Sequence, residues 1–270
     1  MTAPTHAETD EGFLELLHKI ETERFVACAS YKERCVRRRI SVRMRATGVH
    51  TFKDYSNVLD RTPHEWEKLL AALTINVTKF FRDPSAFATL EQVAYPLLRD
   101  TFAGPLQVWS AGCSHGHEPY SLAMGLAEVV GADRFRIEAT DIDRESLATA
   151  SAGRYTDLAL DGVSSDRRQR WFSDEGSTTV APSLRSRVRV LRHDLLRDVM
   201  PEERFHLITC RNVIIYFSRD AQATLFDQLH NSLIPGGLLM LGKVETLVGP
   251  ARDKFQSLSL RERLFRRPPE

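Results

Sequence analysis

The sequence predicts an α/β protein with a doubly wound, mainly parallel sheet, preceded by a small all-helical domain. From residue 106 onward, short β-rich apolar runs alternate with helical segments, which is the element order of a parallel sheet covered by helices. Upstream, apolar residues recur at three- and four-residue spacings, as on one face of a helix. We expect an N-terminal helical domain over 1–75, a linker and connecting helix over 76–105, and the α/β domain over 106–270.

Helical spacing defines the first domain, and it includes one strongly basic stretch. The apolar residues Phe13, Leu16, Leu17 and Ile20 share a helical face, and Thr62-Pro63 is a helix start signal. Seven basic residues and one acidic residue lie between Tyr31 and Arg45, although the net charge of the chain is only +1. This segment, 31–45, is either a solvated face or a surface for an acidic partner.

Five apolar runs predict the strands of the sheet: residues 106–110, 135–140, 187–191, 205–210 and 238–242. The stretch between Gly153 and Arg187 is polar and too long for an ordinary connection between strand and helix. We therefore expect an inserted subdomain at about 160–190. The last residues, 265–270, predict a frayed tail.

Composition excludes several classes of protein. With 42% hydrophobic and 27% charged residues the chain is an ordinary globular protein, and no apolar run approaches the roughly 20 residues that span a bilayer. The polar start lacks the pattern of a secretory signal, so we expect a cytoplasmic protein without membrane insertion. The four cysteines, Cys28, Cys35, Cys113 and Cys210, form no CxxC pair, so neither a disulfide framework nor a metal site is expected.

A glycine-containing turn after the first predicted strand is the first candidate ligand site. Gly112 and Gly116 permit close backbone approach at the carboxyl end of a parallel sheet, where nucleotide-like ligands bind. Glu118 follows at once. A carboxylate there suits a cationic ligand better than a pyrophosphate, and S-adenosylmethionine (SAM) carries a sulfonium and an ammonium group. A purely structural tight turn is the alternative.

Acidic residues follow the next two strands. Asp141 ends the second strand, where a carboxylate can accept both hydroxyls of a ribose, and Asp194 follows the third, a candidate to face an adenine amine. For Asp143, ahead of Arg144, we prefer the role of helix N-cap.

Two further polar clusters are hard to explain by packing alone. Arg211, Asn212 and Tyr216 interrupt an apolar run at the carboxyl edge of the fourth strand, and such edges bind ligands. The segment 76–84 (NVTKFFRDP) joins the two domains. It is either a hinge plugged by its aromatic residues or a source of polar contacts to the ligand from Asn76, Thr78 and Arg82.

Taken together, these motifs resemble the CheR family of chemotaxis receptor methyltransferases. The resemblance is carried, in this order, by NVTKFFRDP, AGCSHGHEPYSLA, ATDID, GRY, HDLL, FHLITCRNVIIYF and LIPGGLLMLGKVE, and it spans Asn76 to Glu245. It implies SAM as methyl donor, S-adenosylhomocysteine as product, receptor glutamates as substrate, and a small antiparallel β subdomain inserted at about 160–190.

The resemblance also assigns roles to individual residues. Carried over to this sequence, the family's cofactor contacts are Asn76, Thr78, Arg82, Glu118, Asp141, Asp194, Leu195, Arg211 and Asn212, to which the glycine turn adds Gly112. Tyr216 matches a tyrosine beside the methyl-transfer centre, and we expect it to orient the substrate carboxylate, with Arg82 as a closing contact. His115 and His117 depart from the family's glycine loop, and Lys243 and Val244 depart from its usual LGHSE.

The expected partner is the cytoplasmic domain of chemoreceptors, bound through the basic segment 31–45. Two alternatives remain at this stage. A nucleic-acid methyltransferase would use the arginine run on phosphates, but no Asn-Pro-Pro-Tyr type motif or base-stacking cluster is present, and we expect no nucleic-acid partner. A non-catalytic adaptor that keeps the cofactor fold is the other.

Overall fold

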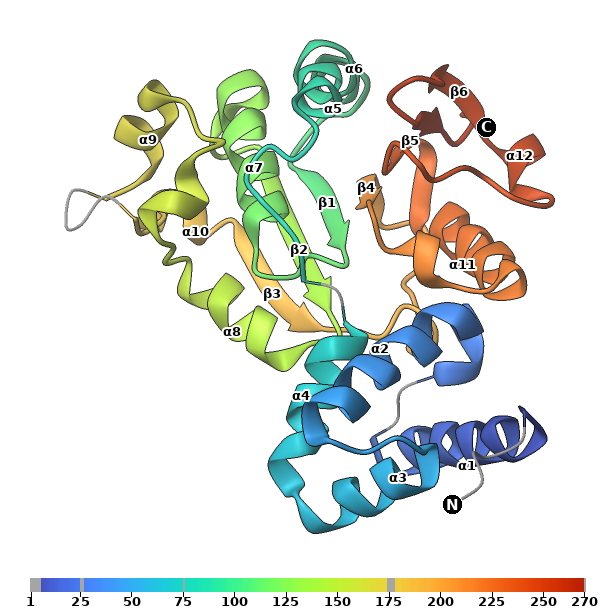
Figure 1. The fold of residues 1–270 in the computed structure, drawn as a ribbon. Coiled ribbons are helices and arrows are strands. Elements are labelled where there is room, and N and C mark those ends of the chain that lie inside the picture. The colour runs from blue at the N-terminus through green and yellow to red at the C-terminus, as the bar shows by residue number, and fades with distance from the viewer. Residues whose placement is uncertain (1–5, 25–26, 75, 174–177, 270) are drawn as a thin grey trace. The chain divides into compact units, whose positions relative to one another are not determined.

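The chain divides into two compact units in the computed structural model (Figure 1), which describes residues 6–24, 27–74, 76–173 and 178–269. The N-terminal unit contains Met1–Ile75 together with Tyr216–Ala221. The second unit contains Asn76–Ile215 and Gln222–Glu270. Each unit has a hydrophobic core of its own.

The N-terminal unit is all-helical, as predicted. Its helices are α1 (His6–Arg24), the single turn η1 (Cys28–Ser30), α2 (Glu33–Thr47), α3 (Phe52–Arg61) and α4 (Pro63–Leu73). Phe13, Leu16 and Ile20 of α1 are buried in its core, because their spacing places them on one helical face. Pro63 opens α4 at the first helical position, where its missing N–H has no intrahelical partner to lose.

A short segment from late in the chain, Tyr216–Ala221, completes this unit. The Lys32 backbone N–H donates to the Tyr216 carbonyl at 2.8 Å, and the Ser218 N–H donates to the Ser30 carbonyl at 2.8 Å. The rings of Tyr31 and Phe217 meet edge to face at 5.2 Å. Phe217 is buried, so the segment belongs to the core of the helical unit.

The second unit is built on a seven-stranded sheet of order β3-β2-β1-β4-β5-β7-β6. Its strands are β1 (Leu106–Ala111), β2 (Phe135–Asp141), β3 (Val188–Arg192), β4 (Phe205–Cys210), β5 (Leu233–Leu241), β6 (Gln256–Ser259) and β7 (Leu264–Arg266). Strands β1 to β5 pair in parallel, and β7 joins β5 antiparallel. The five predicted strands are all present. The prediction of a frayed tail over 265–270 was wrong at its start, because Phe265 is buried and pairs with Leu239 of β5.

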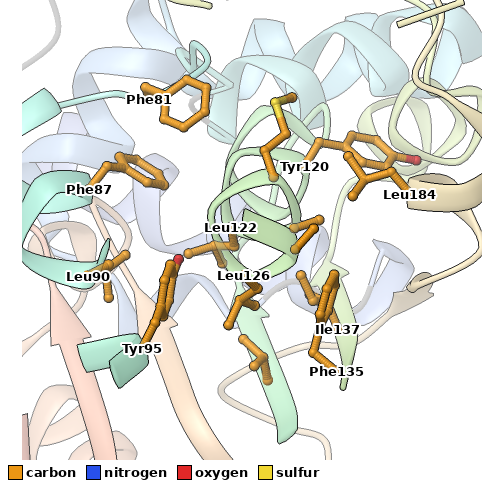
Figure 2. Close-up of a cluster of buried hydrophobic side chains, with 14 of the residues drawn as sticks. Phe81, Phe87, Leu90, Tyr95, Tyr120, Leu122, Leu126, Phe135, Ile137 and Leu184 are labelled. Carbon is orange, nitrogen blue, oxygen red and sulfur yellow. The ribbon is translucent and has the colours of Figure 1, made fainter. Parts of the chain in front are cut away.

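Helices alternate with these strands along the chain. They are α5 (Pro84–Thr89), η2 (Leu90–Ala94), α6 (Tyr95–Thr101), α7 (His117–Leu126), η3 (Ala127–Gly131), α8 (Arg144–Ala152), η4 (Asp157–Leu160), α9 (Ser165–Trp171), α10 (Pro182–Arg185), η5 (Ile214–Tyr216), α11 (Arg219–Ser232) and α12 (Ala251–Lys254). Figure 2 shows the cluster in which Phe87 and Tyr95 meet Leu122 of α7 and Phe135 of β2. Successive β5 residues are buried although they alternate between the two faces, as expected for a strand inside a parallel sheet.

The predicted insertion lies between α8 and β3, and its described part is mostly helical. Antiparallel pairing is present as two isolated bridges, Arg154 with Thr179 and Phe172 with Val180. Helix α9 is anchored by Arg167, which donates to the carboxylates of Glu91 at 2.7 Å and Glu128 at 2.6 Å. Residues 174–177 of this predicted subdomain lie outside the described part of the chain.

The part of the chain that the structure describes contains neither a membrane-spanning helix nor a metal-binding cluster. None of the helices there combines the length and the apolar character needed to cross a bilayer. Within the same residues, no group of three or more His, Cys, Asp or Glu side chains is arranged to hold a metal ion.

Candidate active site

The turn after β1 contains the two predicted glycines, and both are required by close packing within the protein. Gly112 has a φ of 82°, and a Cβ atom there would overlap the side chain of Val213. Gly116 has a φ of 87°, and a Cβ atom there would lie 2.8 Å from the Ala150 Cβ. Both glycines adopt the left-handed conformation that other residues rarely adopt. Contact of Gly112 with a cofactor remains a prediction.

The Glu118 carboxylate is held at the carboxyl ends of β1 and β4. Its Oε1 accepts hydrogen bonds from the Ser110 hydroxyl at 2.8 Å and from the Thr209 hydroxyl at 2.7 Å. Its Oε2 accepts from Arg211 Nη1 at 3.2 Å. Glu118 lies in the first turn of helix α7, where the helix dipole favours a negative charge. Glu118 and Arg211, two of the predicted cofactor contacts, are therefore in direct contact.

Arg211 connects the sheet to the segment that precedes α5. Its guanidinium is 2% exposed, and Nη2 donates to the Arg82 carbonyl at 2.8 Å and to the Asp83 carboxylate at 2.9 Å. The Arg211 Nε is buried and has no hydrogen-bond partner within the described residues. A buried donor of this kind is costly unless something accepts from it.

The segment 76–84 folds back on itself in a tight conformation. Phe81 and Asp83 both have positive φ, 49° and 61°, which is uncommon for residues other than glycine. The Arg82 guanidinium donates to the Val77 carbonyl at 2.7 Å, and the Phe81 N–H donates to the Ser121 hydroxyl at 3.0 Å. Thr78 lies in this segment and is partly buried.

Asp141 lies at the end of β2 in a closed polar network. Its carboxylate accepts from the Ser114 N–H at 2.8 Å and from the Asp143 N–H at 3.0 Å. Asn76 Nδ2 donates to Asp143 Oδ2 at 2.6 Å, so the start of the second unit is tied to this corner of the sheet. Burial raises the pKa of Asp141, and the backbone N–H bonds offset only part of that effect. Asp143 caps α8 by accepting from the Glu145 N–H, which confirms its predicted role.

Asp194 and Leu195 follow β3 and are both buried. One Asp194 carboxylate oxygen accepts from the Leu196 N–H at 2.9 Å, and the Asp194 N–H donates to Asp198 Oδ2 at 2.8 Å. These bonds close a local turn. The contact of Asp194 with an adenine amine stays a prediction.

The three carboxylates of Glu118, Asp141 and Asp194 thus lie at the ends of three neighbouring parallel strands or beyond them. Asn76, Arg82 and Arg211 form hydrogen bonds within this group of residues or next to it. Two family descriptions match this chain: "CheR methyltransferase, all-alpha domain" over residues 11–74 and "CheR methyltransferase, SAM binding domain" over residues 76–264. The chain belongs to the CheR methyltransferase family. It is therefore a SAM-dependent methyltransferase.

Several curated proteins are similar over most of their length. A chemotaxis protein methyltransferase of Listeria monocytogenes is 34% identical over 90% of this chain and 93% of its own. Chemotaxis protein methyltransferase 1 of Pseudomonas aeruginosa is 38% identical over 67% of this chain and 70% of its own. The chemotaxis protein methyltransferase of Escherichia coli is 33% identical over 88% of this chain and 85% of its own.

The chemistry of the site residues fits the donor of the CheR methyltransferases. SAM carries a cationic sulfonium and ammonium, and the residues at or beyond the ends of β1, β2 and β3 include the carboxylates of Glu118, Asp141 and Asp194. The buried, unpartnered Nε of Arg211 is a donor suited to a carboxylate oxygen, and the methionine part of SAM ends in one. The residues present are thus suited to the ligand that the family name specifies.

Two departures from the CheR pattern have structural explanations. The buried His117 ring packs edge to face on Phe80 at 4.8 Å and contacts Tyr155 at 4.8 Å, so it acts as an aromatic core residue. Burial lowers the pKa of His117 to about 4, so the ring is neutral at pH 7. Lys243 Nζ donates to the Ser85 hydroxyl at 2.7 Å and pairs with the buried carboxylate of Glu262 at 3.7 Å. His115 accepts or donates at 3.1 Å with the Ser114 hydroxyl.

Sequence reasoning gave no role to Glu245, which the structure places beside Asn212. The Asn212 N–H donates to Glu245 Oε2 at 2.9 Å, and Asn212 has a φ of 61°. The signal in the sequence was a single carboxylate in a motif, LGKVE, that directly follows a buried strand.

Tyr216, predicted to be catalytic, is described within the N-terminal unit. The Arg39 guanidinium lies over its ring at 4.6 Å from the ring centre. Arg39 is itself buried and donates to the Leu73 carbonyl. The ring of Tyr216 is thus fixed by a cation–π contact, and its part in catalysis remains a prediction.

Proposed function

We propose that this CheR family member transfers the methyl group of SAM to glutamate side chains of chemoreceptors, giving glutamate methyl esters. The observation that carries the proposal is the row of carboxylates, Glu118, Asp141 and Asp194, after three neighbouring strands. Such an acidic edge favours a cationic nucleoside over a phosphate-bearing one. Relatives named as chemotaxis protein methyltransferases support the choice of substrate.

The residues that would hold the donor come from four strand ends and the 76–84 segment. Asp141 would accept the ribose hydroxyls, Asp194 and Leu195 would contact the adenine, and Glu118 and Arg211 would bind the methionine end. Asn76, Thr78, Arg82, Gly112 and Asn212 would line the remainder. When bound, SAM supplies an electrophilic methyl group on a sulfonium.

Catalysis by this chain would then be mainly a matter of positioning. A glutamate with a pKa near 4.3 is ionised at pH 7 and is already nucleophilic, so no general base is needed. We assign Tyr216 to orienting that carboxylate and Arg82 to closing the site. Alignment of this kind can supply several kcal/mol of the barrier.

The surface that we propose for the receptor lies on helix α2. This surface includes fewer residues than the basic segment 31–45. Arg37 pairs with Asp10 and Glu33, Arg39 is buried, and Arg43 binds the Glu65 carboxylate with two hydrogen bonds. These three arginines have structural roles.

Three arginines of α2 remain exposed: Arg34, Arg38 and Arg45. At about 100° per residue they fall within roughly 40° of one another around the helix. We name Arg34, Arg38 and Arg45 the arginine stripe. A straight cationic stripe complements an acidic helical partner, so the stripe is our proposed contact with the receptor's cytoplasmic domain.

A methyl-transfer assay tests this function. The purified chain is incubated with SAM labelled in its methyl group and with a soluble cytoplasmic fragment of a chemoreceptor from the same cell. We expect label on the fragment that mild base releases as methanol, as a carboxyl ester requires. A fragment with its acceptor glutamates replaced by aspartate is the matched control. Base-stable label, label on added nucleic acid, or SAM binding without transfer would each refute the proposal.

A further inference from the structure

Glu245 is a buried carboxylate between two segments that follow neighbouring strands. Its Oε2 accepts from the Gly242 N–H at 2.7 Å and from the Asn212 N–H at 2.9 Å, and its Oε1 accepts from the Ile215 N–H at 3.3 Å. Gly242 follows β5, whereas Asn212 and Ile215 follow β4. The side chain therefore joins the exits of the two strands.

The environment of Glu245 offers backbone dipoles instead of a countercharge. The residue is 3% exposed, and within the described residues it forms no ion pair. Burying a carboxylate is unfavourable unless cations or N–H groups compensate. Burial raises the pKa of Glu245, and the backbone N–H bonds offset only part of that effect.

Glu245 also depends on a glycine and supports a left-handed residue. A Cβ atom on Gly242 would lie 2.7 Å from Glu245 Oε2 and 2.9 Å from the Asn212 nitrogen, so only glycine lets the carboxylate reach this N–H. Asn212 has a φ of 61°, a left-handed conformation that is uncommon for residues other than glycine, although asparagine adopts it more readily than most. The hydrogen bond from the Asn212 N–H to Glu245 helps to hold this conformation.

The turn that Glu245 holds, Arg211–Val213, makes contacts through its first and third residues. Its first residue, Arg211, donates to the Glu118 carboxylate. Its third residue, Val213, lies where a side chain on Gly112 would be. Asn212 stands between them, so its conformation decides whether Arg211 and Val213 can make both contacts at once.

We propose that Glu245 is a positioning residue of the methyl-transfer site, whose carboxylate fixes the turn Arg211–Val213 so that it meets Glu118 and the glycine turn after β1. Glu245 acts through this turn and is assigned no contact with the donor. The inference rests on the proposed function in one respect, namely that this turn binds the donor.

The test compares Glu245→Gln with wild type by calorimetry with S-adenosylhomocysteine. Gln has nearly the same shape, but it loses the charge and turns an NH2 group toward a backbone N–H. Losing charge-assisted hydrogen bonds of this kind should weaken binding about ten-fold. We also expect faster hydrogen exchange at the amides of Asn212 and Gly242, while the amides of β1 and β2 stay protected.

Glu65→Gln is the matched control. Glu65 is another buried carboxylate, 2% exposed, and it accepts from Arg43 and Tyr55 in the N-terminal unit. The control should lower the melting temperature without changing the affinity for S-adenosylhomocysteine. Should Glu245→Gln behave in the same way, Glu245 is structural only and the inference is wrong.

A second pair of variants separates the conformational role from general loss of stability. Glycine adopts the left-handed conformation freely, so Glu245→Gln should weaken binding less in an Asn212→Gly background than in wild type. Equal losses in the two backgrounds would contradict the proposal. If Glu245→Gln does not fold, Glu245→Asp replaces it, with a smaller loss expected in the same direction.

The two proposals fail differently. If wild type binds S-adenosylhomocysteine and Glu245→Gln binds it equally well, only the positioning role is refuted. If wild type does not bind it at all, the proposed function and the positioning role are both refuted. If binding depends on Glu245 but the receptor fragment is not methylated, the substrate assignment alone is wrong.

Discussion

The Arg211 guanidinium and the Glu118 carboxylate form a buried ion pair, with Nη1 and Oε2 3.2 Å apart. Removal of one partner leaves the other charge buried. In Glu118→Gln, Arg211 retains only Asp83 as a countercharge, so we expect a loss of about 2 kcal/mol in the free energy of unfolding. Urea denaturation measures this loss, and calorimetry should show weaker SAM binding.

The exposed pair of Glu33 with Arg37 provides the comparison for this variant. Glu33→Gln should cost less than about 1 kcal/mol, because exposed pairs contribute little. Equal losses in the two variants would show that burial of the Arg211–Glu118 pair has no energetic consequence.

Tyr216→Phe should lower turnover about ten-fold or more, with little change in cofactor affinity, if its hydroxyl orients the substrate carboxylate. Phenylalanine keeps the ring that lies against Arg39, so the free energy of unfolding should change by less than about 1 kcal/mol. Steady-state kinetics and calorimetry on the same preparation separate these effects. Unchanged turnover would remove Tyr216 from the mechanism.

Asp141 should make cofactor affinity depend on pH. Burial raises the pKa of its carboxyl above 3.8, and only the ionised form accepts both ribose hydroxyls. Affinity should therefore be complete at neutral pH and should decline, by at most about ten-fold per pH unit, as the pH falls through that raised pKa. Calorimetry at a series of pH values, from pH 7.5 downward while the protein stays folded, measures the decline. In Asp141→Asn binding should be weak and this pH dependence absent, and an identical pH profile would refute the assignment.

His117 should make the protein less stable in acid. Its folded-state pKa of about 4 is below the ordinary value of 6.5 for histidine, so between these pH values the unfolded chain binds a proton that the native ring does not. Its effect on stability is absent above pH 6.5 and grows as the pH falls to 4, to about 3 kcal/mol at roughly 1.4 kcal/mol per pKa unit. The gap between His117→Phe and wild type, measured by urea denaturation, should shift by this amount in favour of the variant. A constant gap would contradict it.

Charge reversal of the arginine stripe, Arg34→Glu with Arg38→Glu, should raise the KM for a receptor fragment about ten-fold at low salt and less at high salt. The affinity for S-adenosylhomocysteine should not change. Arg37→Gln is the control on the same helix, because Arg37 is already paired with Asp10 and Glu33. If the control raises the KM equally, the stripe is not the contact.

Periodicity and motif spacing predicted most of the fold. The five apolar runs became β1 to β5 because a strand buried on both faces is apolar throughout. Strands β6 and β7 were not predicted, because they are only four and three residues long and are too short to show an apolar pattern. The helical content of the insertion was also not predicted, since its residues are polar and its anchor, Arg167, bonds to distant residues of the chain.

The site was predicted only in part, for a physical reason. Side chains that directly follow parallel strands, such as Asp141 and Arg211, can be located because strand ends share an edge. The bonds between them depend on register and on left-handed residues such as Asn212, which a pattern of residue types does not specify. Glu245 was overlooked because its carboxylate accepts from backbone N–H groups, which no sequence motif records.

Two separate stretches of the chain form the helical unit, Met1–Ile75 and Tyr216–Ala221. Neither unit is therefore a continuous stretch, and a truncation at residue 75 does not yield a clean catalytic fragment. Such a fragment would keep the hexapeptide Tyr216–Ala221 without the helices against which it packs. Phe217 would lose its contact with Tyr31 and would become an exposed apolar site for self-association. If the N-terminal helices were grafted onto another enzyme, the place of the hexapeptide in their packing would be empty. Domain-swap chimeras must therefore include the hexapeptide.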